Sequence, residues 1–413
     1  MLFPQAQISK SESRVVITGA GIVTAMGMGW RANADGFRVG RRCFRPVSAF
    51  DVSQQRCKVA AEVALPDGLP PTLLARNHQK RLDRAAKMLL YAAHEAWSQA
   101  RCAALENLRV VLGTTSGGME LGEAYLRQAL STPTTNRRQP SRVIHYNAHQ
   151  PALNLCDAFG FNGSITVIAN ACASGSNAIG HAFELVRNGV CDSVIAGGYD
   201  ALSLLTFAGF DSLQALSVAG CRPFDAHRDG LTLGEGAAVL ALESLEQALD
   251  RDAEILGEII GYGTATDNHH ITQPHPEGDG ALRAIVSACN SAGILPSQVD
   301  YVNAHGTGTP QNDSTEASAI NRWAGQSAAN LYVSSTKACV GHLLGAAGAA
   351  EAVVSLMALK EGWLPPEREV DAVDETCQFR LVREPMEHKV RVVLSNSFGF
   401  GGANAALAFR RWE

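Results

Sequence analysis

Short apolar runs rich in β-branched residues alternate with longer amphipathic stretches in the first part of the chain. Residues 14–19, RVVITG, form such a run and end in glycine, which is typical of a buried strand. Similar runs predict strands at residues 110–113, 164–169, 193–197 and 237–243. Apolar residues at helical spacing predict helices at residues 83–103 and 175–188. Strands that alternate with helices indicate an α/β protein.

The same alternation begins again near residue 255. A charged helix is expected at residues 246–254, and residues 258–263, EIIGYG, then predict a strand. Further strands are expected at residues 300–304, 331–334, 379–382, 391–395 and 405–409, and helices at residues 280–292 and 345–360. The chain is therefore expected to contain two α/β halves of comparable content.

Length and composition support this picture and exclude several classes of protein. The 413 residues exceed the usual size of one core, so two core-sized units are expected. Hydrophobic residues make up 46% and charged residues 18%, which argues against disorder. The formal net charge of −5 argues against a nucleic-acid binder with a bulk basic field. Apolar runs are too short for a membrane span.

The cysteines and the N-terminus indicate the compartment. The ten cysteines include no C-x-x-C pair, so we expect no metal site, and most lie in apolar runs. That pattern fits a reducing environment better than a disulfide scaffold. The first residues, MLFPQAQISKSES, lack the features of a secretory signal. We therefore expect a cytoplasmic protein.

Gly19 and Gly21 belong to a weak candidate motif after the first predicted strand. The run from Gly19 to Thr24 approaches the dinucleotide-binding pattern G-x-G-x-x-G, but Thr24 stands where the third glycine is needed. A tight turn is the preferred interpretation.

Cys172 is the strongest single candidate for chemistry. A predicted strand runs into Ala171-Cys172-Ala173-Ser174-Gly175, where a helix begins, which is the arrangement of a nucleophile elbow. A helix N-terminus should lower the pKa of the thiol, and small neighbours leave backbone N–H groups free for an oxyanion. The alternative, a buried structural cysteine, stays open on this evidence alone.

Three further motifs carry candidate groups. His305 ends a strand and opens the loop His305-Gly-Thr307-Gly-Thr309, and Lys337 and His342 flank a turn before a Gly/Ala-rich helix. Residues 396–404, NSFGFGGAN, place aromatic residues between glycines, as in a mobile flap over a pocket. Each also has a structural interpretation, as a hydrogen-bonded turn or a closely packed helix start.

Together these motifs resemble the β-ketoacyl-acyl carrier protein (ACP) synthases of the thiolase superfamily. The motifs A-C-A-S-G, N-A-H-G-T-x-T, S-T-K…G-H-x-x-G-A-A-G and N-S-F-G-F-G-G-x-N occur in the family's order. The resemblance implies a thiolase-like five-layer α/β/α/β/α fold with two repeated halves, placed here at residues 14–256 and 257–411. It also implies a homodimer formed through the strand before the nucleophile.

The resemblance implies a role for each motif. Cys172 would take an acyl group from ACP, with the backbone N–H groups of Cys172 and Phe400 holding the oxyanion. His305 and His342 would stabilise the enolate that forms when malonyl-ACP loses CO₂. Lys337 would pair with Glu316 and order the histidines, with Asp313 on the same loop. No cofactor or metal is implied.

The resemblance also implies binding residues. Phe400 would gate the acyl pocket, and substrate contacts are expected from Thr307, Thr309, Thr272, Ser116, Phe210 and Phe398. A basic patch should meet the acidic ACP, and its expected members are Lys80, Arg81, Arg137 and Arg138.

Departures from the family pattern leave the acyl chain and the pathway open. Ser116 replaces a bulky aliphatic residue, residues 143–149 are unusually polar, and Gln214 replaces a basic residue. These changes favour a non-standard acyl chain, such as a polyene or an aryl-primed chain. Two alternatives remain: the catalytic half of a ketosynthase/chain-length-factor heterodimer, and a CoA-dependent thiolase. The second is disfavoured because residues 398–404 lack the cysteine base of thiolases.

Overall fold

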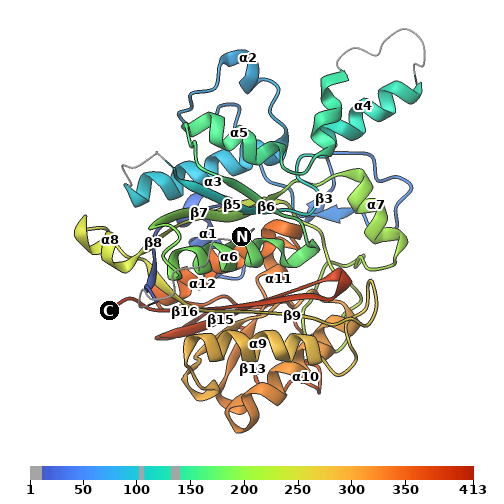
Figure 1. The fold of residues 1–413 in the computed structure, drawn as a ribbon. Coiled ribbons are helices and arrows are strands. Elements are labelled where there is room, and N and C mark those ends of the chain that lie inside the picture. The colour runs from blue at the N-terminus through green and yellow to red at the C-terminus, as the bar shows by residue number, and fades with distance from the viewer. Residues whose placement is uncertain (1–11, 102–106, 132–139) are drawn as a thin grey trace, which may run out of the picture.

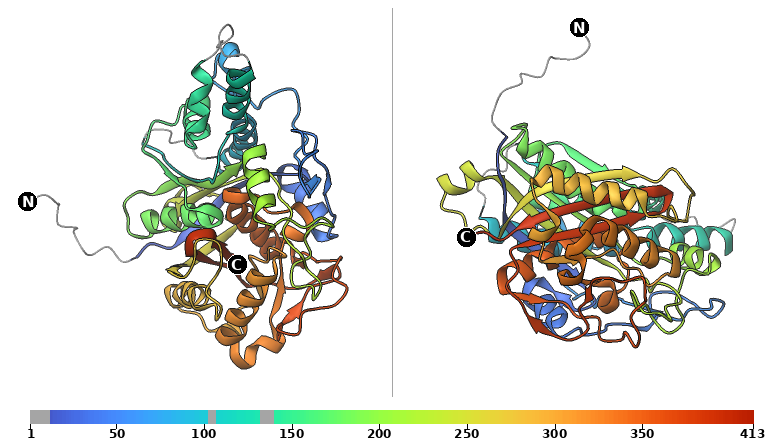
Figure 2. Two further views of the ribbon diagram at one scale, coloured as in Figure 1. Left: turned by 90° about the vertical axis from the view of Figure 1, so that its right-hand side faces the viewer. Right: turned by 90° about the horizontal axis from the view of Figure 1, so that it is seen from below.

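Five stacked layers, in the order helix, sheet, helix, sheet, helix, make up the protein (Figure 1). The computed structural model describes residues 12–101, 107–131 and 140–413. The helical layers contain α3 (Arg84–Ala100) and α5 (Gln150–Phe159), then α6 (Ser174–Arg187) and α12 (Ala347–Glu361), then α9 (Asp279–Ala292) and α10 (Pro310–Ala324). The left view in Figure 2 shows the same order from another side. The predicted α/β fold class is confirmed.

The two sheets repeat one topology. In the N-terminal half the strands are β1 (Val15–Thr24), β5 (Arg109–Gly113), β6 (Ile165–Ile168), β7 (Ser193–Asp200) and β8 (Gly236–Ser244), in the spatial order β6-β5-β7-β8-β1. In the C-terminal half the matching strands are β9 (Gly257–Thr266), β10 (Tyr301–Asn303), β11 (Tyr332–Ser334), β15 (Val392–Gly399) and β16 (Ala403–Arg410), in the order β11-β10-β15-β16-β9. The short strand β13 (Arg380–Leu381) pairs with β11 at the outer edge of this sheet. Both orders read third, second, fourth, fifth, first along the chain, and β1 and β9 join the sheets.

Layering explains the sequence of the central elements. Every residue of β1 and of β8 is buried, because helices cover both faces of their sheet. Helix α12 lies between the sheets and contacts both β8 and β15, so it is apolar on nearly all sides and rich in alanine. Small side chains there let the layers approach closely.

Shorter elements connect this framework. They are β2 (Gly27–Met28), α1 (Gly29–Arg38), β3 (Arg45–Pro46), β4 (Val59–Ala60), α2 (Arg76–Gln79), α4 (Glu120–Ser131), η1 (Pro140–Tyr146), η2 (Ala171–Ala173), α7 (Leu204–Ser212), α8 (Leu245–Asp250), η3 (Pro296–Gln298), η4 (Gly325–Asn330), α11 (Lys337–Val340), η5 (Leu344–Ala346), β12 (Trp363–Leu364), β13 (Arg380–Leu381), β14 (Met386–Glu387) and η6 (Phe400–Gly402). None of the helices in the described ranges is both long and apolar enough to cross a membrane.

Gly19 and Gly21 lie inside β1, so the expectation of a tight turn there was wrong. A Cβ built on Gly19 would lie 2.0 Å from the carbonyl oxygen of Ala96, and one on Gly21 would lie 2.0 Å from that of Ala92. Both alanines belong to α3. The two glycines therefore let α3 pack directly on the backbone of the strand, and no phosphate-binding turn is formed.

Gly21→Ala should destabilise the protein by about 1–3 kcal/mol, because α3 must move away from β1 to admit the methyl group. Urea denaturation followed by circular dichroism measures the change. Gly68→Ala is the matched control, since a Cβ at Gly68 meets no atom within 4 Å. Equal stability of the two variants would contradict this explanation.

Candidate active site

Cys172 lies at an elbow between β6 and α6. It belongs to the short helix η2, which continues into α6, and it is 6% exposed. The residue before it, Ala171, has a φ of +58°, a left-handed conformation that is costly for alanine. Ser174 Oγ accepts a hydrogen bond from the Asn170 N–H at 2.9 Å and thereby braces the turn. The predicted strand–turn–helix context of Cys172 is confirmed.

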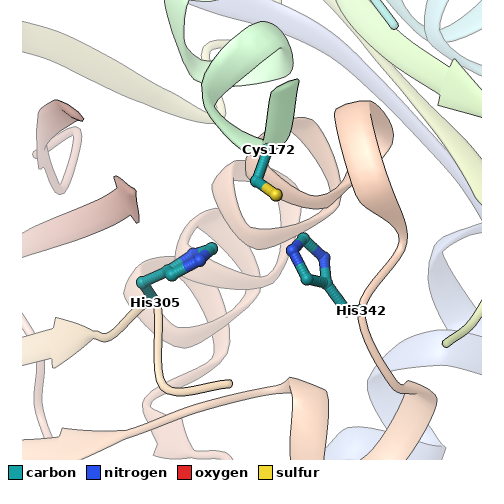
Figure 3. A group of neighbouring side chains, drawn as sticks. All are labelled: Cys172, His305 and His342. Carbon is teal, nitrogen blue, oxygen red and sulfur yellow. The ribbon is translucent and has the colours of Figure 1, made fainter. Parts of the chain in front are cut away.

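His305 and His342 face Cys172 from the C-terminal half (Figure 3). His305 follows β10 and His342 follows α11, and the three side chains offer sulfur and nitrogen atoms that lie within 4.8 Å of one another. The two imidazole rings meet edge to face, with centroids 5.3 Å apart. The structure therefore brings together the three residues that the motifs singled out.

A backbone hydrogen bond determines the tautomer of His342. The Leu344 N–H donates to His342 Nδ1 at 3.1 Å, so the neutral ring must carry its hydrogen on Nε2. His342 Nε2 is buried and has no partner within the described structure. His342 thus presents an N–H donor that is available to a substrate oxygen.

Both histidines are neutral over the physiological pH range. Burial lowers the pKa of His305 and of His342 well below the usual value of 6.5, and the charge of Lys337 lowers both further. A neutral imidazole can donate one hydrogen bond without carrying a charge into the site.

The same three residues form a geometric cluster that could hold a metal ion. A histidine that binds a metal normally donates its second ring N–H to an acceptor. His342 does the opposite, because its Nδ1 accepts from Leu344. The donor set therefore fits a substrate oxygen better than a metal bound by all three residues.

Burial dominates the acidity of Cys172. It raises the pKa of the thiol to about 11, although the charge of Lys337 and the backbone N–H groups of Phe400 and Cys172 oppose the shift. The expectation that the helix terminus gives a lowered pKa was wrong, because loss of water outweighs the nearby dipoles. The proximity of both N–H groups to the sulfur agrees with an oxyanion site between them.

Lys337 pairs with Glu351, so the expected pairing with Glu316 was wrong. Lys337 Nζ donates to Glu351 Oε1, and both side chains are buried. Glu351 belongs to α12. Glu316 is already occupied, since it accepts from the N–H groups of His305 and Gly306, both at 2.8 Å. The sequence signal for Glu351 was a carboxylate in the middle of an apolar stretch, residues 346–354.

Two buried carboxylates of α10 hold the loop that carries His305. Besides its bonds to the loop backbone, Glu316 accepts from Asn396 Nδ2 at 3.2 Å, and burial raises its pKa to about 7. Asp313 accepts from the N–H groups of Thr307 at 3.0 Å, Gly308 at 3.1 Å and Phe224 at 2.8 Å. These bonds satisfy the loop backbone and leave the Thr307 and Thr309 side chains to face the cavity.

A cavity of about 360 Å³ leads from the surface to Cys172. The predicted residues that line it are Thr272, Thr307, Thr309, Phe210, Phe398 and Phe400. The rings of Phe210 and Phe400 lie 5.7 Å apart at its side. Ser116 does not line this channel and lies buried behind it, where its N–H donates to Asp200 Oδ1 at 2.8 Å.

The expected basic residues lie apart from this channel. Lys80 and Arg81 line a separate cavity of about 690 Å³, together with Arg142. Arg137 and Arg138 lie outside the residues that the structure describes. Arg142 was not expected from the sequence, and its place beside Lys80 and Arg81 comes only from the fold.

Comparison with known families identifies the class of protein. Residues 12–248 match the β-ketoacyl synthase N-terminal domain, and residues 256–371 match the β-ketoacyl synthase C-terminal domain. The 3-oxoacyl-[acyl-carrier-protein] synthase 2 of Synechocystis sp. is 39% identical over an alignment 419 residues long, which covers 97% of this chain and 99% of that protein. The chain belongs to the β-ketoacyl synthase family, whose members are acyltransferases. The exact boundary between its halves, residues 256 and 257, stays a prediction.

Solved structures agree with this assignment. The ishigamide ketosynthase/chain length factor matches with a TM-score of 0.91 and 32% identity, over 97% of this chain and 100% of that chain. The AntDE:AntF complex, a type II polyketide synthase acyl-carrier protein with its ketosynthase, matches with a TM-score of 0.85 and 26% identity, with the same coverage. The thiolase-like fold expected from the motifs is confirmed.

Alkylation of Cys172 by iodoacetamide should accelerate about tenfold per pH unit between about pH 6 and 9, because the thiolate fraction grows in that proportion below a pKa of about 11. Peptide mass spectrometry at each pH measures the rate. Cys156 is the matched control, since its pKa is also raised to about 11 and it is equally buried without lining the channel. Cys156 should react more slowly at every pH. A plateau for Cys172 near neutral pH would contradict the raised pKa.

Release of CO₂ from malonyl-pantetheine should stay constant from about pH 8 down to pH 6, because His305 and His342 become protonated only well below pH 6.5. Lys337→Met removes a positive charge that lowers both pKa values, so the acid limb of the profile should move to higher pH. Lys337→Met also leaves Glu351 buried without its partner, which should cost about 3–5 kcal/mol of stability.

Lys360→Met is the matched control for this prediction. Lys360 forms an exposed ion pair with Glu254, so its loss should change stability by less than about 1 kcal/mol and leave the pH profile unchanged. Identical acid limbs in Lys337→Met and the unaltered enzyme would refute the electrostatic role of Lys337.

Proposed function

We propose that the chain catalyses decarboxylating Claisen condensation between an acyl group on Cys172 and malonyl-ACP. The product is a β-ketoacyl-ACP that is two carbons longer. The observation that carries this proposal is the buried set of Cys172, His305 and His342, with His342 fixed as an Nε2–H donor. This set supplies one nucleophile and neutral donors, which the two half-reactions require in turn.

In the first half-reaction, the sulfur of Cys172 attacks the thioester carbonyl of the acyl carrier. The oxyanion forms where the backbone N–H groups of Cys172 and Phe400 converge on the sulfur. Collapse of the intermediate breaks the carrier's carbon–sulfur bond and releases its thiol, which takes up the proton lost by Cys172. The acyl group remains on Cys172.

In the second half-reaction, malonyl-ACP enters by the same channel, with Thr307 and Thr309 toward its pantetheine arm. Loss of CO₂ leaves an enolate whose oxygen carries negative charge. The N–H groups of His305 and His342 stabilise that oxygen without net protonation. The enolate carbon attacks the Cys172 thioester, a carbon–carbon bond forms, and Cys172 leaves as the thiolate.

A CoA-dependent thiolase is the disfavoured alternative. Thiolases need a second cysteine as a base near the nucleophile. Cys172 is the sole cysteine among the described residues that line the channel, and the position facing it is taken by Phe398, Phe400 and glycines. The paired histidines favour decarboxylation instead.

We further infer that a second subunit of the same fold pairs along β6. This strand bonds only to β5 in the described sheet and forms its edge, with side chains that are half-buried. The occupant is a second copy of the chain or a chain length factor, the partner named in the ishigamide structure. Chromatographic sizing of the purified chain, followed by its activity alone, separates the two cases.

Intact mass spectrometry after incubation with a panel of acyl-ACPs should show an acyl adduct that disappears in Cys172→Ala. Cys156→Ala should keep the adduct, since that thiol is equally buried but remote from the channel. Absence of an adduct with any donor would defeat the proposal. A panel that spans saturated, polyene and aryl chains also tests the predicted non-standard acyl chain, and preferential loading of saturated chains would end that idea.

Charge reversal of the basic cavity should weaken the use of carrier-bound substrate. Arg81→Glu and Arg142→Glu should each raise the KM for acyl-ACP several-fold at low salt, with a smaller effect at high salt, because ACP is acidic. The kcat should change little. Arg391→Glu, at a different cavity, is the control. A KM unchanged by either substitution at low salt would refute docking at this patch.

A further inference from the structure

Asp200 ends β7 as a completely buried carboxylate at the centre of five short hydrogen bonds. It lies outside the motifs that the sequence singled out. The donors are Thr114 Oγ1 at 2.7 Å, Ser116 N at 2.8 Å and Gly117 N at 2.7 Å to Oδ1, and Thr115 N at 2.8 Å and Gly345 N at 2.6 Å to Oδ2. All five are N–H or O–H donors, so an ionised carboxylate can accept every one of them.

These bonds tie together two segments from different halves of the chain. Residues 114–117 follow β5, whereas Gly345 lies in η5, three residues after His342. A Cβ on Gly345 would lie 2.5 Å from Thr115 N, so the two segments are in direct contact. At this contact Asp200 accepts hydrogen bonds from both segments. Asp200 therefore fixes the position of the Gly345 peptide relative to the nucleophile half.

Two residues, Leu343 and Leu344, separate Gly345 from His342, and Leu344 is under strain. Leu344 has a φ of +54°, a left-handed conformation that is costly for leucine and persists only where neighbours enforce it. In that conformation the Leu344 N–H points at His342 Nδ1. The bond from Gly345 N–H to Asp200 Oδ2 anchors the next peptide along the chain, at 2.6 Å.

We propose that Asp200 is a positioning residue that sets the tautomer of His342 by anchoring Gly345 and, through it, the Leu344 N–H. The inference rests on the proposed function in one respect: the Nε2–H of His342 matters because it faces the enolate oxygen. Loss of the anchor lets the Leu344 N–H turn away, and His342 then exchanges between its two neutral tautomers. The Nδ1–H form has no N–H toward the substrate.

Asp200→Asn tests this link with almost no change in shape. The amide keeps one oxygen for Thr114, Ser116 and Gly117, but its NH₂ group then faces the N–H groups of Thr115 and Gly345. Two donors cannot bond to each other, so the substitution breaks the Gly345 contact. Thr114→Val removes a donor to Oδ1 and an acceptor of the Gly117 N–H but leaves the Gly345 contact in place, which makes it an internal control.

The experiment compares two half-reactions in the purified full chain. In Asp200→Asn, CO₂ release from malonyl-pantetheine should fall about 100-fold, as for loss of one oxyanion donor. Formation of the acyl adduct on Cys172 should persist within about threefold, because Cys172 and its N–H donors keep their places. Thr114→Val should leave the ratio of the two rates unchanged.

Glu243→Gln controls for the loss of any buried carboxylate. Glu243 lies at the opposite end of the β7–β8 pair, opposite Ser193, and bonds to Arg251 and Thr18 far from the site. Its substitution should lower stability without changing the ratio of the half-reactions. Undiminished CO₂ release in Asp200→Asn, or an equal loss of both half-reactions, overturns the proposal.

A measurement on the unaltered enzyme keeps the proposal testable if Asp200→Asn does not fold. Nuclear magnetic resonance of protein labelled with ¹⁵N-histidine should show His342 as the Nε2–H tautomer at neutral pH. Observation of the Nδ1–H tautomer overturns the proposal. Failure of the unaltered enzyme to acylate Cys172 would instead overturn the proposed function, and the tautomer would still be read directly.

Discussion

The ion pair between Lys337 and Glu351 stabilises a positive charge in the buried interior of the protein. Such a charge is costly unless its partner is held close, and here Glu351 comes from α12, which is clamped between the two sheets. The charge of Lys337 acts on all three reactive groups at once. It adds to the burial that lowers the pKa values of His305 and His342, and it opposes the effect of burial on the pKa of the Cys172 thiol. The chemistry of the site therefore depends on the stacking of the layers.

Buried carboxylates organise the loops around this charge. Glu316, Asp313 and Asp200 each accept more hydrogen bonds from backbone N–H groups than from side chains. Each satisfies a loop that would otherwise leave polar groups unpaired away from water. These carboxylates leave His342 Nε2 and the Cys172 thiol available to the channel, although His342 Nδ1 accepts from the Leu344 N–H. Hydrogen-bonded loops thus surround the few side chains that can donate to a substrate.

The sequence predicted much of this arrangement, and its errors have physical reasons. Apolar runs located β1 and β8, and motifs located Cys172, His305, Lys337 and His342, because their residue types are rare in such contexts. The partner of Lys337 was assigned to Glu316, since pattern alone does not tell which of two buried carboxylates points toward a lysine. The pKa of Cys172 was expected to be low from its helix terminus, but burial is a tertiary property. Asp200 gave no signal, because backbone N–H donors are the same in every sequence.

The placement of α12 also has a consequence for how the chain holds together. The two halves repeat one topology, yet they share the inner helical layer, since α12 contacts β8 of one half and β15 of the other. Helix α12 belongs to the C-terminal half, so removal of the N-terminal half would expose the face of α12 that packs on β8. We therefore expect the two halves to unfold together as one cooperative unit, because the inner helical layer packs on both sheets.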